Sequence, residues 1–256
     1  MMELNAKNYY TKSEYMSASQ FKAFLNCEAA ALAEIEGKYA RETSTALLQG
    51  QYVDAYFTGN VEDFRAAHPE LFKKDGMLKA TYSVCENAIA RLEREPLALE
   101  YLEGEKQVIV TGEIDGVPCK GKLDVLGDGR IVDLKCMRDF APVYRDGERL
   151  DFIRAWGYDI QAFFYTALVK QKTGETLPFF ILAVTKEESP DLMLVRVPDW
   201  LNRSAGEVVH HYIKRFDEIK RHEIKPKRCG RCAYCKATKR LSKPTEYEEF
   251  LEEVML

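Results

Sequence analysis

The chain has 256 residues, of which 46% are hydrophobic and 30% are charged, and this composition is typical of a globular protein with one sizeable core. Its longest apolar runs, such as Pro178–Val184, fall far short of the roughly 18 residues that a membrane span requires, and its N-terminus lacks the apolar region of a signal peptide. A disordered chain and a membrane-spanning protein are excluded, and a cytoplasmic location is expected.

The formal net charge of −4 is distributed unevenly along the chain. Lys214–Lys243 contains twelve lysines and arginines against three acids, whereas the tail 244–256 contains five glutamates. Because contacts with phosphate groups are local, a basic segment can bind nucleic acid even when the net charge is negative. A solvated helix face is the alternative explanation of the same segment.

The first hundred residues have the apolar spacing of helices, and hydroxyl residues that can cap a first turn precede the candidate helices. The expected helices begin at Ser17 or Ser19, at Thr43 or Ser44, and at Thr81, and they end near Gly37, Phe57 and Arg94.

Strand patterns follow after about residue 100. Gln107–Ile114, Val117–Leu126 and Arg130–Cys136 alternate between apolar and polar residues or run apolar. They are separated by Asp115-Gly116 and Asp128-Gly129, dipeptides that suit two-residue hairpin turns. We therefore expect a three-stranded antiparallel meander.

The rest of the chain predicts a helix over 152–170, strands over 179–184 and 193–197, and a helix from Asp199 to about His222. This order predicts an α/β (α+β) fold with a mixed central sheet flanked by helices, and it excludes a helical bundle. No internal repeat or linker divides the chain, so one domain over 1–256 is expected. Its parts are a helical part (1–100), a sheet core (101–200), a helix with a basic cysteine-rich segment (201–243) and an acidic tail (244–256).

The second hairpin of the meander brings charged residues together. If Asp128-Gly129 forms its turn, the register places Asp124 directly opposite Asp133. The same register places Lys122 opposite Lys135. Like charges in such positions are destabilising unless something compensates them, and a divalent cation would do so.

Two carboxylates at this range fit phosphodiester hydrolysis. They can hold Mg²⁺ or Mn²⁺, which polarises the phosphate and lowers the pKa of an attacking water. Lys135 would orient or help deprotonate that water, or offset the developing negative charge. The alternative is a lattice of salt bridges on a solvated face, in which the lysines neutralise the aspartates.

Three short motifs carry a resemblance to a known family. Gly121–Asp124, Ile131–Lys135 and Gln161–Tyr165 follow one another in this order. The series resembles the Asp, Asp/Glu-x-Lys and Gln-xxx-Tyr motifs of RecB-like PD-(D/E)XK nucleases, and it is most similar to the phage exonuclease VIII (RecE-like) branch. The resemblance covers about Ser17 to Lys239.

The resemblance implies a restriction-endonuclease-like fold and assigns the residues of the second hairpin. Asp124 and Asp133 would be metal ligands, and Lys135 would be the catalytic lysine. Gln161 and Tyr165 would lie near the metal and the DNA.

Two features on the helices extend this assignment. Tyr158 lies on the helix face of Gln161 and Tyr165, and packing into the core is the alternative for such aromatic residues. The family often has a glycine followed four residues later by a histidine that ligates the metal, whereas here Gly50 is followed by Asp54. Asp54 either replaces this ligand or is an ordinary helix carboxylate.

Four cysteines form a second candidate site. Cys229, Cys232 and Cys235 have a spacing that suits a metal ion or an iron–sulfur cluster, but one ligand is missing. Ser17–Cys27 resembles the N-terminal segment of RecB-like nucleases in which one distant cysteine completes a 4Fe-4S cluster. Cys27 is thus the implied fourth ligand, and a zinc site or reduced thiols without a metal are the alternatives.

The resemblance implies a DNA exonuclease that acts on double-stranded ends in phage or prophage recombination, with a recombination partner protein and a homo-oligomer as further expectations. The basic segment would contact backbone phosphates without reading sequence. A non-catalytic DNA-binding or assembly module that keeps the fold is the first alternative. An RNA nuclease is the second, because it would use the same metal site.

Overall fold

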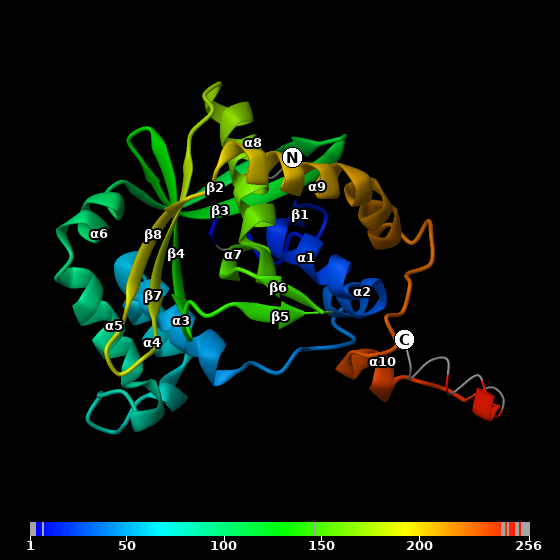
Figure 1. The fold of residues 1–256 in the computed structure, drawn as a ribbon, viewed down its shortest axis with the longest axis horizontal. Coiled ribbons are helices and arrows are strands. Elements are labelled where there is room, and N and C mark those ends of the chain that lie inside the picture. Colours follow the sequence, from blue (N-terminus) through cyan, green and yellow to red (C-terminus); the bar gives the residue numbers. More distant parts are fainter. Residues whose placement is uncertain are drawn as a thin grey trace.

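A six-stranded mixed sheet forms the centre of the molecule (Figure 1). The computed structural model describes residues 4–6, 8–145, 147–241, 244, 246–248 and 251. The strand order is β1-β3-β4-β7-β8, with β2 paired to β3. The strands of the sheet are β1 (Met16–Ser17), β2 (Glu105–Ile114), β3 (Val117–Gly127), β4 (Arg130–Met137), β7 (Phe179–Thr185) and β8 (Leu192–Arg196); β5 (Val143–Arg145) and β6 (Glu148–Leu150) form a separate hairpin.

Helices cover both faces of this sheet (Figure 1). α1, α8 and α9 pack on one face, and α3 and α5 pack on the other. None of the described helices is long and apolar enough to cross a membrane. The α-helices are α1 (Ala18–Asn26), α2 (Glu28–Ile35), α3 (Thr45–Phe57), α4 (Val61–Ala67), α5 (Val84–Glu93), α6 (Pro96–Tyr101), α7 (Phe152–Ala155), α8 (Tyr158–Thr173), α9 (Asp199–Lys220) and α10 (Ala233–Ala237).

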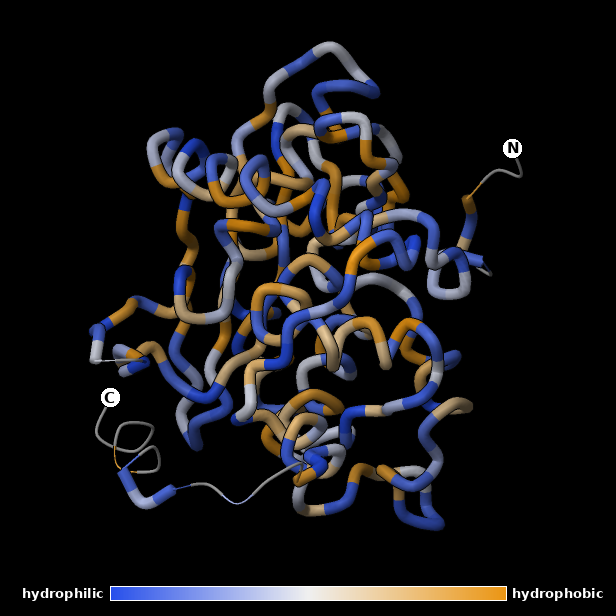
Figure 2. The backbone as a smooth tube through the Cα atoms, turned by 90° about the vertical axis from the view of Figure 1, so that its right-hand side faces the viewer, coloured by the Kyte–Doolittle hydropathy of each residue, from blue (hydrophilic) through white to orange (hydrophobic). Residues whose placement is uncertain are grey.

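The predicted α/β fold with a mixed sheet and an antiparallel meander is confirmed. Both hairpins turn at the predicted dipeptides, because Ile114 pairs with Val117 and Gly127 pairs with Arg130. Most of the predicted acidic tail, and Lys243 at the end of the basic segment, lie outside the described residues. In Figure 2 hydrophobic stretches lie mainly on segments inside the molecule, and the outer loops are largely hydrophilic.

Two predicted helices are each divided in two. The helix expected from Ser17 to Gly37 breaks at Cys27, whose backbone is extended with φ −166° and ψ 109°. The helix expected over 152–170 breaks at Gly157, which has the left-handed φ of 63°. This conformation favours glycine, and a Cβ atom at position 157 would also lie 2.7 Å from Cδ of Lys22, whose side chain would have to move.

β3 and β4 pair over a short distance and then separate. Their antiparallel pairs run from Gly127–Arg130 to Val125–Val132. On its other edge β4 pairs with β7 in parallel from Ile131 to Met137, while β3 pairs with β1 at Cys119 and with β2 along most of its length. The strands therefore diverge beside Asp124 and Asp133. Figure 1 shows β3 and β4 running apart.

The larger core lies between the sheet and the helices α1, α8 and α9. Phe21 of α1 is fully buried there, with its ring centroid 5.6 Å from Phe164 of α8 and 5.1 Å from Phe216 of α9. Aromatic rings at such distances add an attraction to the burial of apolar area. These three rings hold the N-terminal helix against the rest of the fold.

We expect Phe164→Ala to lower the free energy of unfolding by about 3–5 kcal/mol, because the fully buried ring would leave a cavity. Urea unfolding followed by circular dichroism measures this loss. Val208→Ala on the exposed side of α9 is the control and should change stability by no more than about 0.5 kcal/mol. Equal losses in the two variants would contradict the assigned core.

Candidate active site

Asp124 lies where the regular alternation of β3 breaks. Leu123 packs in the core beneath α8, whereas Val125, two residues later, packs in the core beneath α3 and α5. The β2 residue that would pair with Asp124 is Gln107, which has φ 54° and is absent from the β2–β3 pairs. At this irregular position the Asp124 side chain reaches the backbone of β4.

The predicted register of the second hairpin fails at the same place. The β3–β4 pairs end at Val125–Val132, so the expected pairings of Asp124 with Asp133 and of Lys122 with Lys135 do not form. Asp124 Oδ2 accepts a hydrogen bond of 2.9 Å from the backbone N–H of Leu134. A side chain thus replaces the ladder bonds where the two strands separate.

Asp133 is the buried centre of the site, with 1% of its surface exposed. Its Oδ1 accepts a hydrogen bond of 2.6 Å from Nε2 of Gln161 on α8. Its Oδ2 forms an ion pair with Lys135 of the same strand. The Nζ atom of Lys135 also lies 5.1 Å from the ring centroid of Tyr158. The two ends of this carboxylate therefore have different partners.

Tyr165 supports the site from behind. Its hydroxyl donates a hydrogen bond of 2.9 Å to the carbonyl oxygen of Lys122 in β3. Its ring covers Gly121, where an added Cβ would lie 3.0 Å from the ring carbons. Gln161 reaches the carboxylate and Tyr165 holds the strand, so the two residues of the helix motif have different tasks.

Asp54 of α3 faces the same site from the other side. Its Oδ1 is buried and has no hydrogen-bond partner among the described residues. α3 approaches β4 closely at Gly50, where an added Cβ would lie 3.7 Å from the carbonyl oxygen of Cys136. The Gly50/Asp54 pair thus brings a carboxylate to the point where β3 and β4 diverge.

A pocket of about 330 Å³ opens beside these side chains, and Asp133 and Tyr165 lie outside its lining. Sequence reasoning missed Lys22 and Gln51 in its wall, because a lysine or glutamine on a short helix reads as an exposed residue. Lys22 Nζ donates a hydrogen bond of 3.2 Å to the carbonyl oxygen of Trp156. The predicted site residues that line the pocket are Asp54, Asp124, Lys135, Tyr158 and Gln161.

Comparisons with known proteins place this geometry in a family. A family model described as a PDDEXK-like domain of unknown function matches residues 17–238. The chain belongs to this PDDEXK-like family. A crystal structure of a protein from Eubacterium rectale, provisionally described as an exonuclease, has a TM-score of 0.92 and 39% sequence identity, and the match covers 98% of each chain. No curated protein matches. The predicted membership of the PD-(D/E)XK nuclease superfamily is confirmed.

Burial and mutual repulsion raise the pKa values of Asp54 and Asp124 in the PDDEXK-like pocket. The pKa of Asp124 lies well above its usual range because the group is buried and because Asp133 and Asp54 are close. Burial raises the pKa of Asp54 to about 6. Burial alone would lower the pKa of Lys135, but the Asp133 and Asp124 carboxylates outweigh it and raise that pKa.

This electrostatic arrangement fits a divalent cation. Asp54, Asp124 and Asp133 supply hard oxygen ligands, and the unpartnered Oδ1 of Asp54 is a donor atom that a cation would use. A bound cation would also relieve the repulsion among the three carboxylates. Gln161 contacts Oδ1 and Lys135 contacts Oδ2 of Asp133, which does not line the pocket, so Asp54 and Asp124 are the carboxylates that a cation entering the pocket would meet first.

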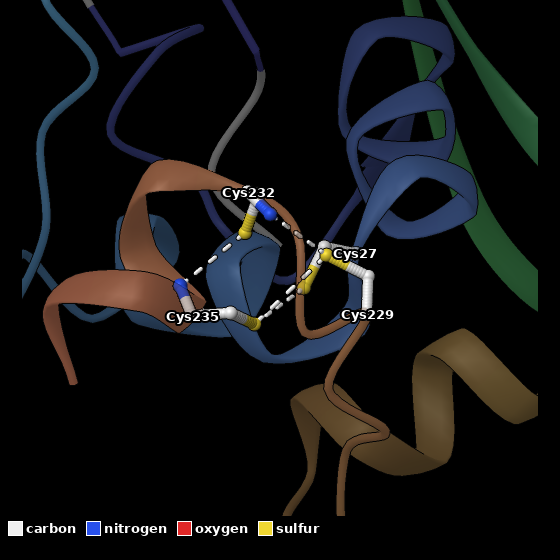
Figure 3. A group of neighbouring side chains, drawn as sticks. All are labelled: Cys27, Cys229, Cys232 and Cys235. Atoms are coloured by element: carbon white, nitrogen blue, oxygen red, sulfur yellow. Dashed lines mark hydrogen bonds between the residues drawn. The ribbon is translucent and has the colours of Figure 1, made fainter. Parts of the chain in front are cut away.

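The four cysteines of the PDDEXK-like chain meet at one point (Figure 3). Their sulfur atoms lie within 4.8 Å of one another. Sγ of Cys27 is 3.5 Å from Sγ of Cys235, which is 3.9 Å from Sγ of Cys229. Burial raises the pKa of Cys229, but the N–H groups of Cys232 and Arg231 lower it to about 6, which favours a thiolate ligand.

Glu28, the residue after Cys27, fixes this arrangement. Its carboxylate accepts two hydrogen bonds of 2.8 Å from the guanidinium of Arg215 on α9 and one of 2.6 Å from the N–H of Lys227. The N–H of Ala29 donates to the carbonyl oxygen of Lys227 at 3.1 Å. The segment that carries the last three cysteines is therefore tied directly to the start of α2.

We expect saturating Mg²⁺ to raise the melting temperature, because it would bind the pocket of the folded protein and not the unfolded chain. At a hundred times the dissociation constant the rise should be about 5–10 °C. Asp54→Ala should reduce this rise by more than half, since it removes a ligand, while Asp63→Ala on the exposed side of α4 should preserve it. Differential scanning fluorimetry measures the shift, and an equal rise in both variants would argue against Asp54 as a ligand.

Proposed function

We propose that this PDDEXK-like chain is a metal-dependent deoxyribonuclease that hydrolyses phosphodiester bonds in the pocket of Asp54, Asp124, Asp133 and Lys135. The observation that carries the proposal is the buried Asp133 carboxylate, which is held between Lys135 and Gln161 beside two further carboxylates. A salt-bridge lattice on a solvated face does not account for carboxyls that are buried and repel one another.

The chain's own residues divide the work of the reaction. Asp54, Asp124 and Asp133 would hold Mg²⁺ or Mn²⁺, which when bound polarises the phosphate and lowers the pKa of the attacking water. The raised pKa of Lys135 keeps its ammonium group charged, so it stabilises the negative charge that develops on the phosphate oxygens. Gln161 fixes the orientation of Asp133, and Tyr165 fixes β3.

Exonucleolytic action is the finer part of this proposal. The Eubacterium rectale protein, which is 39% identical and provisionally described as an exonuclease, supports it. Preference for double-stranded DNA ends, a role in phage recombination with a partner protein, and a homo-oligomeric state rest on the resemblance to RecE-like nucleases. An RNA nuclease would use the same residues, so substrate comparison belongs in the test.

The basic segment contributes less to DNA binding than its composition suggests. Arg215 is paired with Glu28, and Arg221 is paired with Asp217 at 3.0 Å and with Glu223 at 2.7 Å. Arg228 donates to the carbonyl oxygen of Cys235 at 3.0 Å. Several of its cations thus stabilise the C-terminal segment, which favours a structural role for this part of the stretch.

We expect the protein to degrade end-labelled linear duplex DNA with Mg²⁺ and to spare a closed circular duplex. Asp133→Asn and Lys135→Ala should each lower the rate by about 10²–10⁴-fold, because the first removes a metal ligand and the second removes the ammonium group that stabilises the negative charge on the phosphate oxygens. The control is Lys172→Ala on the exposed side of α8, which should keep the wild-type rate. Gel analysis of the labelled products measures the rates.

Each other result has a defined meaning. Cleavage of the circle would make the enzyme an endonuclease, and faster cleavage of single-stranded RNA than of either DNA would replace the proposed substrate. Wild-type rates in Asp133→Asn would reject the site. An absence of cleavage together with salt-sensitive DNA binding would favour the non-catalytic module.

We also propose that Cys27, Cys229, Cys232 and Cys235 hold a metal centre with four thiolate ligands. The resemblance implies a 4Fe-4S cluster. The sulfur separations of 3.5 and 3.9 Å match instead the edges of a tetrahedron around one ion, which are about 3.8 Å for a zinc–sulfur bond of about 2.3 Å. A cube of four iron atoms requires thiolates that lie further apart.

Metal analysis of anaerobically purified protein distinguishes a 4Fe-4S cluster from a single zinc ion. We expect one four-thiolate centre per chain, seen either as iron with acid-labile sulfide and visible absorption or as one zinc ion. Cys235→Ala should abolish the centre and lower stability by several kcal/mol, because structural metal sites contribute folding energy. Cys119→Ala, which changes a buried cysteine outside the group, is the control. Wild-type protein without iron or zinc would contradict the proposal.

A further inference from the structure

A second, larger groove of about 630 Å³ adjoins the candidate active site. Ala46, Leu47, Cys136 and Tyr158 line both the groove and the metal-binding pocket, so the two hollows share a wall. The β5–β6 hairpin and the start of α7 contribute the far side, since Tyr144 and Phe152 also line the groove. Nothing in the proposed hydrolysis requires this space.

The groove exposes two large aromatic side chains. Trp156 is 48% exposed and Tyr144 is 73% exposed. The guanidinium of Arg145 lies 4.9 Å from the ring centroid of Trp156. Exposed aromatic rings gathered in a concave surface mark a binding site, and they offer flat faces on which other rings can stack.

The charge of the groove suits an anion. Asp139 is the acidic residue in the groove lining, and its carboxylate forms an ion pair of 2.6 Å with Arg138. Lys186 lines the groove, and its Nζ donates to the carbonyl oxygen of Ala46 at 3.0 Å. Within the part of the chain that the structure describes, no carboxylate forms an ion pair with Lys186 or Arg145. Arg145 lies against the ring of Trp156 and is not part of the groove lining, so Lys186 is the groove cation that can meet a phosphate.

The backbone ties the stacking surface to the active-site pocket. The carbonyl oxygen of Trp156 accepts a hydrogen bond from Lys22, which lines the metal-binding pocket. Two residues later Tyr158 lies between the groove and Lys135, with its ring 5.1 Å from Nζ. A base stacked on Trp156 would therefore lie in the groove that shares this wall with the active-site pocket.

We propose that this groove binds unpaired nucleotides of the DNA strand being cut, with one base stacked on Trp156, a second against Tyr144, and Lys186 beside a phosphate. This rests on the proposed nuclease function. Bases inside a duplex have both faces covered by their neighbours, so a Trp156 ring can stack only on a base that has left the duplex. The groove thus selects a frayed or single-stranded end.

The test measures binding apart from cleavage, with a short single-stranded oligothymidylate in Ca²⁺ or EDTA and fluorescence anisotropy as the readout. We expect Trp156→Ala to weaken binding by about 5- to 100-fold and Trp156→Phe to restore most of it, because a phenyl ring still stacks. Tyr144→Ala should weaken it less, because its more exposed ring buries less area. The matched control is Trp200→Ala, an exposed tryptophan on α9 outside the groove, which should bind like the wild type.

Fluorescence gives an independent readout, because the chain has two tryptophans. In Trp200→Phe the remaining emission comes from Trp156, and it should be quenched by the oligonucleotide. Equal affinities in Trp156→Ala and Trp200→Ala, or unquenched emission, would overturn the proposal even if the wild type cuts DNA. If Trp156→Ala binds more weakly than Trp200→Ala but the wild type does not cut DNA, the hydrolytic function is rejected and the groove remains a single-strand binding surface.

Discussion

The burial of Asp133 is the constraint on which the rest of the structure depends. A carboxylate with 1% exposure loses its hydration, so it must be neutralised and hydrogen-bonded from within the protein. Lys135 supplies the charge and Gln161 supplies the hydrogen bond. The first turn of helix α8 therefore has to present Gln161 to Asp133 of β4.

The divergence of β3 and β4 creates the space that this carboxylate faces. If β3 and β4 stayed paired, their backbones would be hydrogen-bonded to each other at Asp124 and Asp133, and the gap that could admit a ligand would be closed. Asp124 replaces a ladder bond through Leu134, and Tyr165 holds the backbone of β3 at Lys122. Backbone groups that lose ladder hydrogen bonds where the strands separate are thus bonded by the side chains of Asp124 and Tyr165, which both belong to the sequence motifs.

Local patterns predicted the sheet, because alternation and the Asp-Gly turns act over a few residues. They could not predict where two strands part, since that depends on β1 and β7 pairing from distant positions. The motif residues Asp54, Asp124, Lys135 and Gln161 were named in advance and meet in one pocket. Lys22 and Trp156 were not, because their exposure and neighbours follow only from how α1 packs against the break at Gly157.

The contact between the start of α2 and the cysteine-rich segment also bears on how the protein is made. Cys27 and Cys235 are 208 positions apart, and Phe21 and Glu28 depend on Phe216 and Arg215 for their packing and charge. Helices α1 and α2 therefore leave the ribosome long before their partners exist. They must wait, with apolar surface uncovered, until nearly the whole chain has been synthesised, so this fold is completed from its last segment rather than grown from its first.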